Sequence, residues 1–162
     1  MTTAAVDGVV EQDAATESRQ LVVFLLGREE YAVPITRVQE IIRYTSPRPM
    51  PGADHSVEGV INLRGRIIPV VDLRRRMGSD AERADSAKIV VVEVGETTLG
   101  IEVDEVSEVL TVHATDCESA PQGAGGGGSA LAADVIDAVV KLEGRLLVIL
   151  DLDRMFEGSA TF

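Results

Sequence analysis

The sequence repeats itself, and this internal repeat limits the possible folds more than any other feature. Residues 21–42 align without gaps with residues 89–110, and residues 57–76 align with residues 136–155. The matched pairs are Gly27 with Gly95, Val38 with Val106, Glu40 with Glu108, Gly65 and Arg66 with Gly144 and Arg145, and Asp72 with Asp151. The chain therefore contains two copies of one structural unit.

The pattern of each copy predicts five short strands, because its apolar runs are rich in valine and isoleucine and are bounded by turn signals. We expect strands near residues 21–26, 30–35, 39–44, 57–63, 66–73, 89–94, 98–103, 107–113, 135–142 and 145–151. Short helical turns are expected after the last strand of each copy, at residues 73–77 and 152–156. The sequence therefore predicts an all-β protein with short helical turns.

Five twisted strands per copy are enough to curl into a small barrel, which reduces the exposed sheet edges. We therefore expect two barrel subdomains within residues 20–157, the first at about 20–80 and the second at about 86–157. The apolar runs IIPVVDL and LLVILDL predict that one strand face fills a barrel and the other meets its neighbour. An acidic leader, residues 1–19, and a glycine-rich loop, residues 122–130, are expected to be disordered.

Composition and charge exclude several classes of protein. The net charge of −12 and the 3% content of aromatic residues disfavour nucleic-acid binding, which needs cations and stacking surfaces. No apolar run is long enough to span a membrane, so direct membrane insertion is not expected. The single cysteine, Cys117, and the absence of a secretory pattern at the N-terminus favour the cytoplasm.

One basic cluster stands out on this acidic chain. It consists of Arg64, Arg66, Arg74, Arg75 and Arg76. A solvated rim beside a strand and a turn is the favoured interpretation, and an anion-binding patch is the alternative.

Catalytic and metal-binding motifs are not evident. The two histidines, His55 and His113, lack ligand partners at metal-site spacing, and the glycine-rich stretch 123–128 lacks the lysine of a phosphate-binding loop. Asp72 and Asp151 occupy equivalent positions, where capping of the following helical turn is favoured over a catalytic carboxylate pair. We therefore expect a non-enzymatic protein with no cofactor, metal or small-molecule substrate, while a small enzyme using these two aspartates is the alternative.

Four separated motifs follow one another along the chain, namely LGREEYAVPITRVQEI, EGVINLRGRIIPVVDLR, GIEVDEVSEVL and GRLLVILDLD. Their order and spacing resemble those of the CheW-like family of chemotaxis coupling proteins. The resemblance covers residues 20–156 and implies two SH3-like five-stranded barrels. It also implies an adaptor that binds the cytoplasmic tip of methyl-accepting chemoreceptors and the regulatory domain of the histidine kinase CheA.

The resemblance also implies roles for individual residues. Val38 and Glu40 look like receptor-binding residues, and Arg64 looks like a residue associated with function. We expect a groove between the barrels, where a receptor helix lies against a set of apolar residues and meets Glu40 at the rim. The apolar residues of this expected groove are Val33, Ile35, Val103 and Val106.

Contact with the kinase is expected at the barrel ends, where Arg64, Gly65 and Arg66 are the candidates. The acidic leader and the glycine-rich insertion depart from the simplest family pattern. The sequence leaves two alternatives to this function. One is a CheW-like adaptor of another pathway, such as twitching or gliding motility or second-messenger control. The other is a regulatory domain excised from a larger kinase or from a receiver-fused coupling protein.

Overall fold

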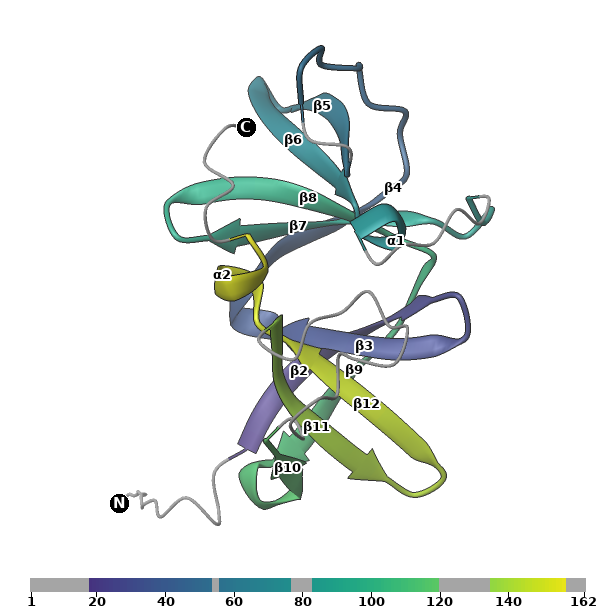
Figure 1. Cartoon of the computed structure of the whole chain (residues 1–162), viewed down its shortest axis with the longest axis vertical. Helices are drawn as coiled ribbons and strands as arrows, with labels where there is room; N and C mark the ends of the chain where they lie inside the picture. The colour runs from purple at the N-terminus through teal and green to yellow at the C-terminus, as the bar shows by residue number, and fades with distance from the viewer. Residues whose placement is uncertain (1–17, 54–55, 77–82, 120–134, 157–162) are drawn as a thin grey trace, which may run out of the picture.

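The computed structural model describes residues 18–53, 56–76, 83–119 and 135–156, and Figure 1 shows two curled sheets one above the other. The lower sheet has six strands in the order β10 (Cys117–Glu118), β11 (Ile136–Leu142), β12 (Arg145–Leu150), β3 (Glu29–Pro34), β2 (Ser18–Leu26), β9 (Glu105–His113). The upper sheet has five strands in the order β4 (Val38–Arg43), β7 (Lys88–Val94), β8 (Thr97–Val103), β6 (Arg66–Asp72), β5 (Val57–Leu63). The predicted all-β class is confirmed.

The ten predicted strands all form, and the structure adds β10, a two-residue strand that the sequence did not predict. Because β2 begins at Ser18, the last two residues of the predicted leader belong to a strand. The rest of that leader, residues 1–17, and the glycine-rich loop at 122–130 lie outside the described residues.

Each sheet combines strands from both copies of the repeat. The β2–β3 hairpin of the first copy joins β9, β11 and β12 of the second, where β3 runs parallel to β12. In the same way the β7–β8 hairpin of the second copy joins β4, β5 and β6 of the first, where β8 runs parallel to β6. The prediction that residues 20–80 and 86–157 each form one barrel is therefore wrong.

This hairpin exchange follows from two short crossovers. A single 3₁₀ turn, η3 (Ile35–Arg37), connects β3 to β4, and only Asp104 separates β8 from β9. Connections of this length carry the chain directly into the other sheet. The two copies are similar enough that the pattern of apolar residues does not reveal which copy receives each hairpin.

Three apolar clusters form the core, one inside each curled sheet and one between the two sheets. The lower sheet curls around one that includes Leu21, Val23 and Ile149, and the upper sheet curls around another that includes Ile89 and Val91. The largest cluster lies between the sheets and takes the alternate residues of the same strands. It includes Val22, Phe24, Val33, Val71, Val90, Val92, Ile101, Val103 and Leu150. The prediction that one face of the strands fills a barrel while the other meets its neighbour is therefore confirmed.

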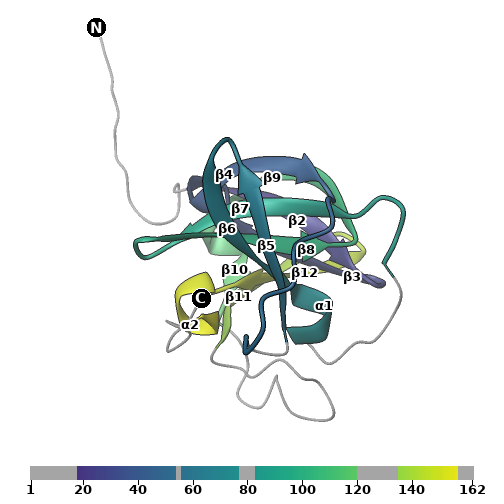
Figure 2. The ribbon, with the colours of Figure 1, turned by 90° about the horizontal axis from the view of Figure 1, so that it is seen from above.

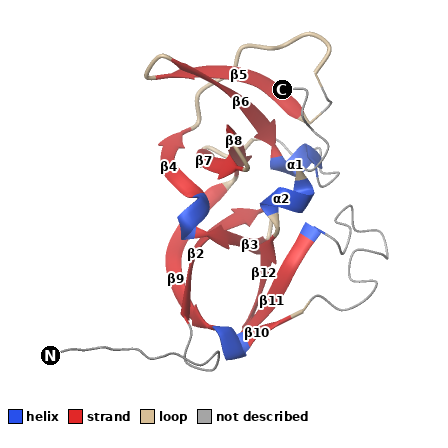
Figure 3. Cartoon of the chain, turned by 90° about the vertical axis from the view of Figure 1, so that its left-hand side faces the viewer, coloured by secondary structure: helices blue, strands red, loops and turns tan. Residues whose placement is uncertain are grey.

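The helices are short, and Figure 3 shows how little of the chain they occupy. Both α1 (Leu73–Arg76) and α2 (Leu152–Met155) lie on the same side of the molecule, near the level where the sheets meet. The Oδ1 atom of Asp151 accepts a hydrogen bond from the backbone N–H of Arg154 at 3.1 Å. Asp72 Oδ1 accepts one from the N–H of Arg74 at 3.0 Å. The capping role predicted for both aspartates is therefore confirmed.

A second 3₁₀ turn among the described residues, η4 (Ala114–Asp116), connects β9 to β10. Among the described residues, no helix is both long and apolar enough to cross a lipid bilayer.

Candidate functional site

Glu40 and Arg64, which the sequence assigned to function from separate motifs, contact each other directly. Glu40 lies on β4, and Arg64 lies in the turn between β5 and β6. The Arg64 Nη1 atom is 2.5 Å from Glu40 Oε2, and Nη2 is 3.0 Å from Oε1. This two-pronged contact, which we call the Glu40–Arg64 pair, is the strongest geometry for an arginine and a carboxylate. The pair raises the pKa of Arg64.

The arginine of the Glu40–Arg64 pair is accessible to a partner, and the glutamate is partly so. The side chain of Arg64 is 73% exposed and that of Glu40 is 25% exposed. Glu40 also follows a β-bulge, since the pairing of β4 with β7 shifts register between Val38 and Glu40. Exposed ion pairs add little to stability, so this geometry suits a contact surface better than a structural brace.

The turn that carries Arg64 has an unusual backbone. Arg64 has φ 53° and Gly65 has φ 85°, as required by a two-residue hairpin loop between the paired residues Leu63 and Arg66. Among the described residues, Arg64 is the only non-glycine with positive φ. The Asn62 Oδ1 atom accepts a hydrogen bond from the Gly65 N–H at 2.9 Å and so fixes this turn.

The apolar residues predicted for the groove fall into two groups. Ile35, Val38 and Val106 are half-buried and pack against the central cluster between the sheets. Val33 and Val103 are 0% exposed. Because they offer no surface to a partner, their assignment as receptor contacts is wrong. Both faces of their strands are covered, which strand alternation alone does not indicate.

The residues predicted for the kinase side surround the same turn. The Arg66 Nη2 atom donates to Thr98 Oγ1 at 2.9 Å, which ties β6 to the β7–β8 hairpin. In the other sheet, the equivalent Arg145 pairs with Glu30 and, at 2.8 Å, with Glu108. The two sheets therefore carry related but different charged surfaces, and the kinase contact at Arg64, Gly65 and Arg66 stays a prediction.

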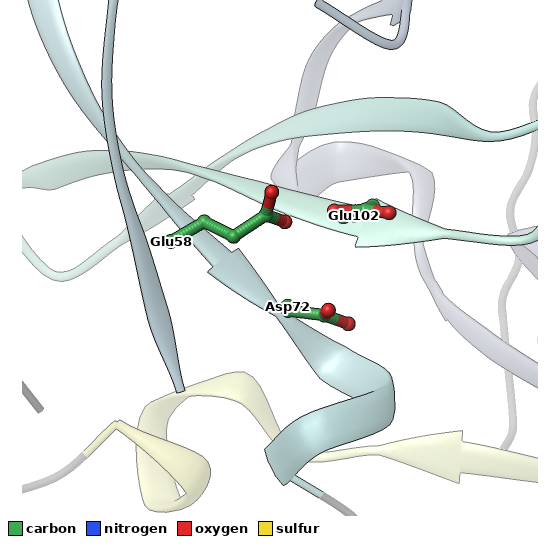
Figure 4. A group of neighbouring side chains, drawn as sticks. All are labelled: Glu58, Asp72 and Glu102. Carbon is green, nitrogen blue, oxygen red and sulfur yellow. The ribbon is translucent and has the colours of Figure 1, made fainter. Parts of the chain in front are cut away.

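A buried charge cluster, which the sequence did not reveal, connects β5, β6 and β8. Oxygen atoms of Glu58, Asp72 and Glu102 lie within 4.8 Å of one another, and Figure 4 shows these side chains gathered where the strands cross. Arg74 Nη2 lies 2.9 Å from Glu102 Oε2. Arg83 reaches Glu102 Oε2 at 2.6 Å and Glu58 Oε1 at 2.8 Å. We call these five residues the buried charge cluster.

The arginines make this cluster unsuitable for a metal. Two guanidinium groups already contact the carboxylates, and they would repel a divalent cation. The Oε2 atom of Glu58 is nevertheless buried without a hydrogen-bond partner. Burial, followed by the hydrogen bond to Glu58, raises the pKa of Glu102 to about 7, although Arg83 acts in the opposite direction. The raised pKa reflects the cost of burying a second negative charge beside Glu58.

Sequence reasoning missed this cluster because its members come from four separate segments. The available signal was Glu102, a charged residue inside the apolar run LGIEV. The interpretation of the basic cluster as a solvated rim is wrong for Arg74, which is 5% exposed and ion-paired. The solvated-rim interpretation is correct for Arg64, whose side chain is 73% exposed.

Two interlocked barrels whose surface carries a two-pronged ion pair, and whose shared core is edged by half-buried apolar side chains, define a scaffold that acts through its surface. Residues 20–160 match the family model described as CheW-like domain. The chain therefore belongs to the CheW-like family.

Curated relatives agree with this membership. The chemotaxis protein CheW of Bacillus subtilis is 36% identical over 88% of this chain and 89% of the relative. The CheW of Rhizobium meliloti is 36% identical over 87% and 89% of the two chains. A crystal structure of scaffolding protein TtCheW from Thermoanaerobacter tengcongensis superimposes with a TM-score of 0.79, at 30% identity over 87% of this chain and 94% of that one. This likeness confirms the predicted CheW-like fold.

Proposed function

We propose that this chain is a chemotaxis adaptor that couples methyl-accepting chemoreceptors to the histidine kinase CheA. Its partners are the cytoplasmic tip of the receptor and the regulatory domain of the kinase. Membership of the CheW-like family and the relatives named chemotaxis protein CheW support this role. The adaptor works in the cytoplasm, is recruited to membrane-associated receptor arrays, and catalyses no reaction.

The observation that carries this proposal is the Glu40–Arg64 pair. Two residues singled out by separate family motifs, 24 positions apart, form one contact. Its arginine is largely exposed and has a left-handed backbone. Backbone strain of this kind is concentrated at functional sites, where the surrounding structure maintains it.

The receptor contact combines this charge with nearby apolar surface. A receptor helix lays an apolar stripe against the accessible parts of Ile35, Val38 and Val106, and a basic residue of that helix competes with Arg64 for Glu40. Val33 and Val103 support this surface from inside the central cluster. They take no part in the contact itself.

The kinase contact uses the turn at Arg64, Gly65 and Arg66. We expect each single contact to be weak, because exposed charged contacts gain little free energy in water. An array increases the overall affinity, since every further attachment is made at a high effective concentration. Affinity for isolated partners is therefore expected to be lower than affinity for assembled receptors.

Binding to a purified receptor cytoplasmic fragment tests this proposal. Glu40→Lys reverses the charge at the pair, and we expect at least a tenfold loss of affinity for the receptor, measured by calorimetry. Glu118→Lys makes the same charge change on β10 at a side chain that is 58% exposed and is the matched control. Unchanged receptor binding by Glu40→Lys would reject the assignment.

A charge swap separates structure from recognition. The double variant Glu40→Lys with Arg64→Glu restores an ion pair of opposite polarity. If the pair serves only to hold β4 against the turn, the swap restores both thermal stability and binding. The proposed function predicts that stability returns and receptor binding does not.

A further inference from the structure

A concave site lies at the end of β4 and the start of β7, on the upper sheet. Its cavity volume is about 600 Å³, and the residues that line it include Arg43, Tyr44, Arg83, Asp85 and Lys88. This volume is within the range of pockets that take small ligands. None of these residues belongs to the predicted receptor or kinase contacts.

Two cations of this site stand directly opposite each other on neighbouring strands. Arg43 on β4 pairs in register with Lys88 on β7, and like charges at such positions repel. Within the described ranges, neither side chain forms an ion pair, whereas Arg19, Arg37, Arg64 and Arg145 all do. Among the described residues, Arg28, Arg48 and Arg66 also form no ion pair, but Arg43 and Lys88 differ in facing each other across a concave site, where both charges are available to an anion.

The wall of the site is held in place by the buried charge cluster. The Arg83 guanidinium carbon lies 3.8 Å from the centre of the Tyr44 ring. Arg83 donates to Glu102 and Glu58, and the Tyr44 hydroxyl donates to Glu58 Oε1 at 2.8 Å. These contacts neutralise Arg83 and fix the stack. The charge available to a ligand therefore comes from Arg43 and Lys88.

We propose that this pocket binds a phosphate group, with Arg43 and Lys88 as its cationic ligands. Both side chains are donors without acceptor capacity, and their two charges match the charge of about −1.5 to −2 on a phosphate monoester at pH 7. The planar fork of an arginine fits phosphate oxygens, and lysine adds a point charge. A carboxylate ligand would neutralise only one of the two cations. Asp85 opposes the bound anion and sets an upper limit on its affinity.

Phosphate titration of the full chain, followed by backbone amide NMR at low ionic strength, tests this inference. Inorganic phosphate, phosphoserine and adenosine monophosphate serve as separate ligands, so that their relative affinities distinguish a free anion from a phosphorylated residue or a nucleotide. We expect saturable shifts at Tyr44 and Lys88 for at least one of them. Sodium chloride at matched ionic strength is expected to produce none.

Variants assign the binding to the pocket. Arg43→Gln removes one charged donor and is expected to weaken binding roughly tenfold or more, and Asp85→Asn is expected to strengthen it. Arg28→Gln, at another exposed arginine without an ion pair in the described part of the chain, is expected to change nothing. The inference is overturned if no phosphate compound gives saturable shifts, or if Arg43→Gln binds as tightly as the wild type.

Discussion

Arg64 keeps a left-handed backbone although glycine or asparagine is favoured at its position in a two-residue turn. Its side chain is mostly exposed, so packing does not explain the choice of residue. The contact with Glu40 does explain it, because only a long side chain with two donors can reach across from the turn to β4. At the scale of single residues, the turn accepts backbone strain at Arg64 and gains a charged contact at the surface.

Replacing Arg64 by glycine is therefore expected to separate stability from binding. Glycine relieves the positive φ but removes the ion pair. The urea midpoint, followed by circular dichroism, is expected to stay unchanged or rise, while affinity for the kinase falls. A lower midpoint together with unchanged binding would show that Arg64 is a structural residue.

Glu102 determines a second residue-level property, the dependence of stability on pH. Burial and the hydrogen bond to Glu58 raise the pKa of Glu102 from 4.5 to about 7 in the folded chain. A raised pKa means that the folded state holds the proton more tightly than the unfolded state does. The resulting stabilisation is complete below about pH 4.5 and is lost as the pH rises through about 7.

Comparing the wild type with Glu102→Gln isolates this contribution, since all other titrating groups are common to both proteins. Relative to the variant, the free energy of unfolding of the wild type is expected to fall by on the order of 3 kcal/mol between pH 5 and pH 9. Chemical denaturation at several pH values measures the difference. A constant difference between the two proteins would mean that Glu102 keeps an ordinary pKa.

Hairpin exchange is the main feature at the scale of elements. The sequence predicted the strands and their turns, because alternation and glycine positions are local signals. It did not predict the partner of each hairpin, because the β2–β3 and β7–β8 hairpins carry nearly the same apolar pattern. The lengths of the connections at η3 and Asp104 decide the pairing. They carry information that a repeat alignment does not use.

The exchange predicts that half of the chain does not fold alone. A fragment of residues 1–85 keeps β2 and β3 but lacks β9 and β12, which are their neighbours in the lower sheet. We expect it to be unfolded, or to dimerise by supplying the missing pairings from a second copy. Circular dichroism and size-exclusion chromatography distinguish these states. A folded monomer would contradict the observed pairing.

For the whole molecule, the cluster between the sheets determines how the two barrels act together. Its residues come from both sheets, and Leu73 and Leu152 add side chains from the two short helices. The runs IIPVVDL and LLVILDL predicted this shared core correctly. The same property misled the site prediction. Val33 and Val103 resemble surface valines in a half-buried strand, but both faces of their strands are covered.

The charged half of the site was easier to predict than the apolar half. Glu40 and Arg64 were identified from motifs, but their contact was not, because the sequence does not indicate which turn lies beside the end strand β4. The buried charge cluster and the phosphate pocket depend on side chains from several strands. Such sites become visible only when the topology is known.

Co-sedimentation with receptor-containing membranes is the most direct test of the adaptor function. Membranes carrying the native chemoreceptor are mixed with the native CheA kinase, with or without this chain, and the kinase in the pellet is measured. We expect the kinase to sediment with receptor only when the chain is present. We also expect Glu40→Lys to abolish this recruitment and Glu118→Lys to leave it unchanged. Kinase recovery that is independent of the chain would contradict the proposed adaptor function.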